Sequence, residues 1–227
     1  MNRIILFFLL STISFSAISQ DARNVSITFF PEMNGEIIVL NKEIHIISSN
    51  EKLNVTKLKF YVSHLSFYKD EQLVWQDNEL AHLMDAENDM NIKFTIKKNI
   101  EFNKIKFGLG IDSVTNVSGA LEGDMDPLKG MYWTWQSGYV NFKMEGTSTA
   151  IRSESQRFEY HLGGYSAENN TYNTIDLTVG NSETINIAID FHKFLSDFNV
   201  VTHHNVMSPG KVAVDLSKIL ASCFSIR

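Results

Sequence analysis

The chain has 227 residues and a formal net charge of −6 at pH 7, from 26 acidic and 20 basic residues. A mildly acidic chain is poorly suited to binding nucleic acid, because that binding depends on neutralising phosphates. Cys223 is the only cysteine, so no intrachain disulfide can form and a hydrophobic core must supply the stability.

The N-terminus has the pattern of a cleavable export signal. Asn2 and Arg3 precede the uninterrupted apolar run Ile4–Leu10, and small or polar residues follow. This run is shorter than the roughly 20 apolar residues that span a bilayer, and no other segment approaches that length, so we expect no membrane span. We predict a signal peptide at residues 1–19 and a secreted or periplasmic domain at residues 20–227. A retained N-terminal anchor is the alternative.

Two-residue alternation of apolar side chains dominates the mature chain. The clearest case is Ile105–Ile111, in which every second residue is apolar and lies on one face of a predicted strand. Asn34-Gly35 and Gly180-Asn181 are turn dipeptides between neighbouring runs. Further strands are predicted at Val25–Phe30, Glu36–Leu40, Leu53–Val62, Ile92–Ile96, Met131–Met144, Phe158–Leu162, Ile175–Val179 and Ile185–Phe191. This spacing predicts an all-β fold, an antiparallel β-sandwich in a single domain.

Helix is scarce in the expected fold. Phe191–Phe198 is long enough for two helical turns, and Lys211–Ser222 has a mixed pattern. The strand alternation changes phase at His64, where we predict a β-bulge. Asp112–Lys129 has little periodicity and is predicted to be a long loop. Loops of that length are uncommon unless they are functional.

An ordered set of motifs fills the centre of the chain. Asp112 and the loop asparagine Asn116 come first, followed by Asp126-Pro-Leu. The run Met131–Tyr139, which reads Met-x-Trp-x-Trp-x-x-Gly-Tyr, comes next, and His161-Leu-Gly closes the set. In this order and spacing, the motifs resemble those of the MbnP-like family of copper-associated periplasmic and surface proteins.

The resemblance implies a copper site. Histidines bind copper in this family, and in some members a tryptophan oxidised to kynurenine joins them, an oxidation associated with a dihaem peroxidase partner. By this resemblance His161 is a ligand and Trp133 is the residue that oxidation would convert. Many members have a histidine directly after the loop asparagine, where this chain has Val117. With one donor fewer, we expect a weakened site that prefers Cu(I), which Val117→His would strengthen toward Cu(II).

A short cluster near the C-terminus adds further candidate donors. His203 and His204 lie close to Met207, and imidazole with thioether suits copper, especially Cu(I). Adjacent strand residues point to opposite faces, so at most one of the two histidines serves a given site. The predicted metal ligands are therefore His161, His203, Met207 and Trp133.

Structural roles are the alternative for the same side chains. Met131, Trp133 and Trp135 alternate onto one face of the predicted strand, where tryptophans usually fill a core. His161 can equally be a structural histidine satisfied by hydrogen bonds. The remaining histidines show no partner pattern and are predicted to lie at the surface: His45, His82 and His192.

Other functions receive less support from the sequence. Asp112, Asp124 and Asp126 are carboxylates of the kind that calcium prefers, but they do not fit the EF-hand loop, and turn formation explains them equally. The chain lacks the motifs of serine hydrolases, zinc proteases and phosphate-binding loops, so we predict no enzyme. We expect a secreted copper-binding protein that captures or handles metal. The alternative is a metal-free extracellular module that contacts protein or glycan.

Overall fold

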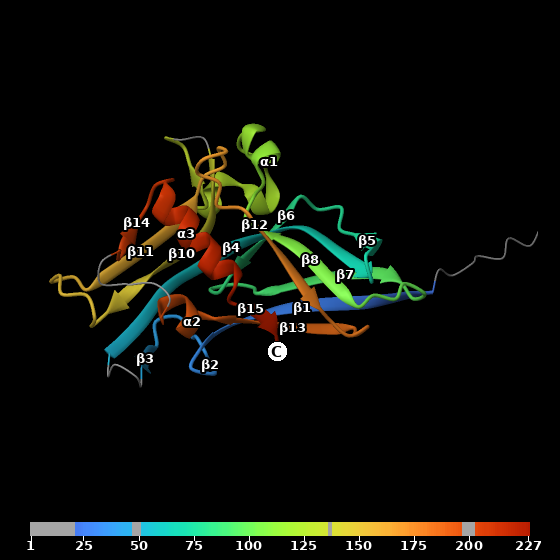
Figure 1. Ribbon diagram of the computed structural model, residues 1–227, viewed down its shortest axis with the longest axis horizontal. Coiled ribbons are helices and arrows are strands. Elements are labelled where there is room, and N and C mark those ends of the chain that lie inside the picture. The colour runs from blue at the N-terminus through green and yellow to red at the C-terminus, as the bar shows by residue number, and fades with distance from the viewer. Residues whose placement is uncertain (1–20, 47–50, 136–137, 197–202) are drawn as a thin grey trace, which may run out of the picture.

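The computed structural model describes residues 21–46, 51–135, 138–196 and 203–227 (Figure 1). Strands make up 51% of the described residues and helices 14%, which confirms the predicted β-rich fold with little helix. Two mixed sheets share one hydrophobic core in a sandwich-like arrangement, and the larger sheet is curled. The predicted signal peptide lies outside the described residues.

The smaller sheet is built around β1 (Ala22–Met33). Its order is β15-β13-β1-β2, and β7 also pairs with β1. The bounds of these partners are Glu36–Ile37 for β2, Asn91–Lys97 for β7, Thr184–Asp190 for β13 and Phe224–Ile226 for β15. The hairpin between β1 and β2 turns at Asn34-Gly35, as predicted, with both residues at positive φ.

The larger sheet is centred on β4 (Glu51–Lys69). Its main order is β12-β8-β4-β10-β11-β14. In addition, β3, β5 and β6 pair with β4, and β9 pairs with β10. The bounds are Glu43–Ile46 for β3, Gln72–Gln76 for β5, Ala81–Asp85 for β6, Lys104–Leu109 for β8, Tyr132–Trp133 for β9, Gly138–Ser148 for β10, Arg157–Gly163 for β11, Asn173–Thr178 for β12 and Asn205–Val206 for β14.

Most strand pairs are antiparallel, as predicted, and two are parallel. β1 runs parallel to β13, and β14 runs parallel to β11. A two-residue period tells which face of a sheet a side chain occupies, but it carries no information about strand direction. The sequence pattern therefore predicted the strands without predicting these two pairings.

A bulge interrupts the long strand β4. Its register against β8 shifts between Ser63 and Ser66, and His64 has a positive φ of 50°. The predicted bulge is confirmed, and it leaves the His64 side chain exposed. Residues before the bulge pair with β10 and residues near and beyond it pair with β8, so one strand serves both halves of the sheet.

The segment predicted as a long loop contains short helical turns instead. These are α1 (Ser113–Val117), η1 (Gly123–Met125) and η2 (Pro127–Lys129). Asp112 caps the start of α1 by accepting hydrogen bonds from the N–H groups of Val114 and Thr115. Helices of three to five residues are too short to produce a recognisable hydrophobic period in the sequence.

Two longer helices lie in the C-terminal third. α2 (Phe191–Ser196) confirms the start of the predicted helix, whose last residues lie outside the described part of the chain. α3 (Lys211–Ala221) buries Leu216 and Leu220 and contacts both β11 and β12. It therefore bridges two strands that lie far apart in the order of the larger sheet (Figure 1).

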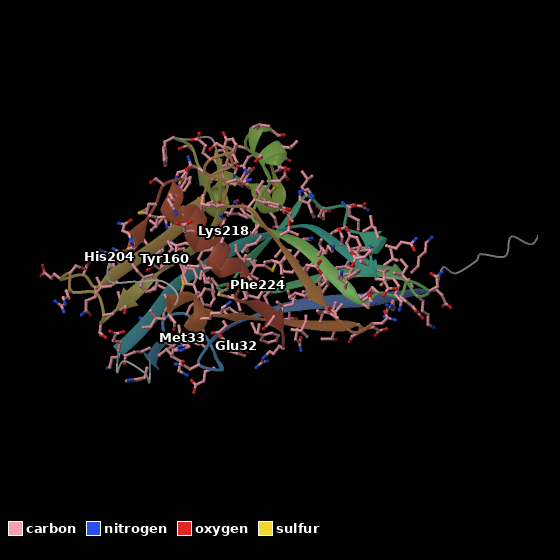
Figure 2. All side chains as sticks on the ribbon, viewed as in Figure 1. Glu32, Met33, Tyr160, His204, Lys218 and Phe224 are labelled. Atoms are coloured by element: carbon pink, nitrogen blue, oxygen red, sulfur yellow. The ribbon has the colours of Figure 1, made fainter. Side chains whose placement is uncertain are left out.

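Two hydrophobic clusters stabilise the fold. In the main core, Phe29 of β1 meets Phe60, Phe107 and Phe224 edge-on, and so joins the two sheets. Phe224 is labelled near the middle of the molecule in Figure 2. The second cluster lies on the other face of the larger sheet, beneath the segment 112–133; its buried members are Tyr61, Ala81, Ile111, Met125, Met131, Tyr139 and Val140. This segment is thus packed against the sheet rather than free in solvent.

Candidate metal centre

His161 lies in the middle of β11 on the outer face of the larger sheet. Its neighbours Tyr160 and Leu162 point into the main core, so alternation directs His161 outward. The histidine is nevertheless only 7% exposed, because surrounding side chains cover it. Its Nε2 lies 2.8 Å from Oε1 of Glu145 on the neighbouring strand β10.

Charged side chains surround this imidazole. Lys57 of β4 lies 3.1 Å from the second carboxylate oxygen of Glu145, and Lys143 is the residue directly opposite His161 on β10. Burial lowers the pKa of His161, and the nearby Lys143 lowers it further, against the opposing effect of Glu145. A lowered pKa keeps the ring neutral at pH 7, the state in which a histidine can bind a metal ion.

Trp133 borders the same face. It pairs with Gly138 across the β9–β10 hairpin, and its ring lies over Gly163, two residues after His161. A Cβ atom at Gly163 would come within 2.6 Å of this ring, so only glycine permits such close packing. Trp133 is half-buried against the second hydrophobic cluster, which supports its predicted packing role.

Trp135 does not fill a core as expected. The predicted strand Met131–Met144 is broken by a turn between β9 and β10, and Trp135 lies in that turn. It is 65% exposed, and its ring lies 5.5 Å from that of Trp133. The prediction that the two tryptophans and Met131 share one strand face is therefore wrong, because a turn ends the alternation.

The predicted His/Met cluster is divided by the position of β14. Val206 pairs with Tyr160 of β11 and is buried like it, and the exposed Met207 follows directly after this short strand. Figure 2 shows His204 beside Tyr160. His203 is exposed and lies four residues before Met207. If the register of β14 with β11 continued by one residue, it would set Met207, rather than His203, opposite the histidine of the His-Leu-Gly motif.

Comparison with known families identifies the chain. The family model described as MbnP matches residues 22–208. The chain belongs to the MbnP family. MbnP from Methylosinus trichosporium has a similar solved structure, with a TM-score of 0.62 over 85% of this chain and 87% of that one. The two sequences are 12% identical, so this similarity shows a shared fold. A comparison with curated proteins finds no match.

The loop asparagine of the MbnP motif has a structural role in this chain. Asn116 is 2% exposed; it donates to the carbonyl groups of Ile111 and Asp112, and it accepts from the N–H of Tyr139. Val117, the next residue, is 70% exposed at the end of α1. The asparagine thus fixes the loop on β10 and presents the following side chain to solvent.

The three aspartates weighed as calcium ligands bind protein donors instead. Asp112 accepts from Thr115 and pairs with His64, Asp124 pairs with Lys129, and Asp126 caps η2. These contacts support the turn-forming interpretation. Across the described ranges, no group of three His, Cys, Asp or Glu side chains is arranged to hold a metal ion.

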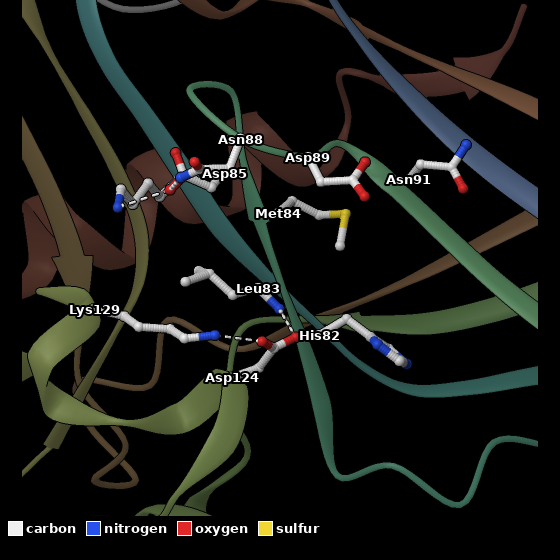
Figure 3. Close-up of a pocket in the computed structure, with 10 residues that line it drawn as sticks. His82, Leu83, Met84, Asp85, Asn88, Asp89, Asn91, Asp124 and Lys129 are labelled. Atoms are coloured by element: carbon white, nitrogen blue, oxygen red, sulfur yellow. Dashed lines mark hydrogen bonds and ion pairs between the residues drawn. The ribbon is translucent and has the colours of Figure 1, made fainter.

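A polar pocket of about 420 Å³ lies beside β6 (Figure 3). Two ion pairs line it, Lys59 with Asp85 at 2.9 Å and Lys129 with Asp124 at 2.6 Å. His82 also lines it and lies 2.6 Å from Asp77, with 20% of its side chain exposed. The prediction that His82 is a surface residue without a partner is therefore wrong. Because these charged side chains pair with one another, the lining of the pocket indicates no particular ligand.

The cap of α1 should make stability depend on acid pH. Burial opposes ionisation of Asp112, but hydrogen bonds from Thr115 and His64 outweigh it and hold its pKa at about 2, below the usual 3.8. A lowered pKa in the folded state stabilises the protein above pH 3.8, and this contribution is lost as pH falls toward 2. In Asp112→Asn, which retains a capping side chain, we expect the urea midpoint to fall less steeply over this range than in the parent. Equal slopes would contradict the assignment.

The sequence did not predict Glu145 as the partner of His161. Glu145 lies sixteen residues before His161, and the strand pairing of β10 with β11 brings the two together. The alternation of β10 does place Lys143 and Glu145 on the face opposite the core, which is the signal available in the sequence. That signal gives the face but not the partner strand.

Proposed function

We propose that the mature protein binds copper at His161, on the outer face of the larger sheet. The observation that supports this best is a buried imidazole held neutral by its surroundings and bonded to Glu145 through one nitrogen. Its other ring nitrogen, Nδ1, has no hydrogen bond to any described residue. Met207 directly follows β14, and one more residue of the β14–β11 register would set it opposite His161; imidazole with thioether suits copper, especially Cu(I).

The other two predicted donors, Trp133 and His203, are less central to the proposed site. Trp133 borders the site and would join it as the kynurenine that the family resemblance implies, with a dihaem peroxidase as the oxidising partner. His203 precedes β14 and is exposed, so it is an outer donor at most. His161 and Met207 form the centre of the proposed site.

The proposed role is capture or handling of copper without catalysis. We place it in the periplasm or outside the cell, after cleavage of residues 1–19. No helix in the described part of the chain is long and apolar enough to cross a membrane.

We further propose that residues 20–227 form one domain, because one buried core draws on strands from β1 to β15.

Copper titration of the purified mature protein tests the proposal. We expect about one ion per chain, with Cu(I) bound more tightly than Cu(II), and His161→Ala should weaken binding at least about tenfold. His45→Ala is the matched control, since this histidine side chain is 66% exposed and lies on β3. Equal copper affinity in the parent and His161→Ala would remove His161 from the site.

A metal-free interaction module is the second candidate function. It is favoured by apolar side chains more than half exposed on α1, η2 and the β9–β10 turn, namely Val114, Val117, Leu128 and Trp135. Exposed apolar side chains that form a contiguous patch are typical of surfaces that contact other molecules. A parent protein that binds no copper in the titration would favour this second function.

A further inference from the structure

Glu145 and His161 form an unusually enclosed pair on the outer face of the larger sheet. Three histidines in the described residues lie within 2.8 Å of a carboxylate oxygen: His64, His82 and His161. The side chain of His161 is 9% exposed, against 20% for His82 and 45% for His64. Water therefore competes least for the hydrogen bond of His161.

The contact determines which ring nitrogen carries the proton. An ionised carboxylate only accepts hydrogen bonds, so the Nε2 atom that faces Glu145 must be the N–H of the neutral ring. Nδ1 then keeps its lone pair. Lys57 holds the other oxygen of Glu145 at 3.1 Å and limits rotation of the carboxylate.

We propose that Glu145, held by Lys57, is a positioning residue that fixes His161 as the Nε2–H tautomer and leaves Nδ1 to bind the metal ion. This inference rests on the proposed copper function. A carboxylate that fixes tautomer and ring orientation commonly raises the affinity of a metal-binding histidine. The ion itself would then be bound by a nitrogen close to the backbone of β11, a rigid element inside the sheet.

Glu159 offers a matched control for charge. It lies directly opposite Glu145 in the β10–β11 register, and it acts electrostatically on His161 without a hydrogen bond to its ring. Glu159→Gln therefore removes a nearby negative charge and keeps the contact with Glu145. Glu145→Ala removes both, whereas Glu145→Gln retains an acceptor oxygen and should rescue the tautomer.

Nitrogen-15 NMR of the histidine rings in the metal-free protein tests the inference directly, at a pH where the rings are neutral. The resonances that disappear in His161→Ala identify this residue. We expect a pyridine-like Nδ1 and a pyrrole-like Nε2 in the parent, in Glu159→Gln and in Glu145→Gln. Glu145→Ala should show a mixture of tautomers, because nothing then holds the proton on Nε2.

Copper affinity provides the second measurement. Glu145→Ala should weaken binding about tenfold, while Glu159→Gln should change it less than about threefold. A parent ring protonated on Nδ1, or a Glu145→Ala variant with unchanged tautomer and unchanged affinity, would overturn the inference. A parent that binds no copper would overturn the proposed function instead, and the NMR result would still decide whether Glu145 fixes the ring.

Discussion

Asn116→Ala is expected to lower the free energy of unfolding by about 2–4 kcal/mol. The side chain is almost fully buried and makes three hydrogen bonds to backbone groups, at 2.9 Å, 3.1 Å and 2.8 Å. Alanine would leave the N–H of Tyr139 and the carbonyl of Ile111 without these partners. A buried polar group without a partner costs about 1–3 kcal/mol.

The loss should be concentrated in the segment that Asn116 holds. Residues 112–133 cover the second hydrophobic cluster, and the asparagine ties the start of that segment to β10. Amide hydrogen exchange should therefore increase most in this segment, with less change in the main core strands β1 and β4. Urea denaturation gives the total change in stability, and exchange measured by mass spectrometry gives its location.

Val117→Ala is the matched control for this experiment. The residue is adjacent in sequence but 70% exposed, so its replacement should change stability by less than about 0.5 kcal/mol. An equal loss in both variants would show that the helix α1, rather than the asparagine contacts, determines the effect. An Asn116→Ala variant as stable as the parent would contradict the structural role of the motif asparagine.

The sequence predicted the strands well where one side chain in two faces a core. Ile105, Phe107 and Leu109 are buried on one face of β8, as the alternation indicated. Ile111 belongs to the second cluster instead, because the chain turns at Gly110, which has a φ of 105°. Alternation predicts the face of a regular strand and loses its meaning beyond such a turn.

The candidate site was predicted less completely, because its contacts join distant segments. The motif set indicated His161, but its partner Glu145 lies on another strand, and sequence spacing gives no register between strands. Met207 was grouped with His203 by proximity in sequence. The parallel pairing of β14 with β11, which the sequence did not predict, ends at Tyr160 and Val206, one residue before His161 and Met207. Strand pairing and direction were the missing information in both cases.

Val117→His is expected to strengthen Cu(II) binding at least about tenfold, because an imidazole would replace a side chain without a lone pair. The backbone at this position is held in place: Asp112 caps α1, and Asn116 ties its end to Tyr139. A histidine there would bring its ring to a rigid helix end, so little conformational freedom is lost on binding. Competition titration with a Cu(II) chelator measures the gain, at one pH for all variants because imidazole must be deprotonated to bind.

Val114→His controls for simply adding a histidine to α1. Val114 is also strongly exposed, but it lies three residues earlier, away from the place after the motif asparagine. This variant should leave Cu(II) affinity within about threefold of the parent. A gain as large as that of Val117→His would mean that any imidazole on this helix attracts copper, independent of the motif position.

The double variant Val117→His with His161→Ala decides whether the two histidines share one ion. The loop is tied to β10 at Tyr139, whereas His161 pairs with Lys143 of the same strand. Tyr139 and Lys143 are four residues apart, which corresponds to about 13 Å along a strand. To share one ion, both rings would have to span this separation; the ring of Trp133 covers Gly163, two residues after His161. If they converge, the gain from Val117→His disappears once His161 is alanine, and the cycle gives a large coupling energy. If the same gain persists without His161, the loop forms a separate site beside the tryptophans, and a single convergent copper site is wrong for this chain.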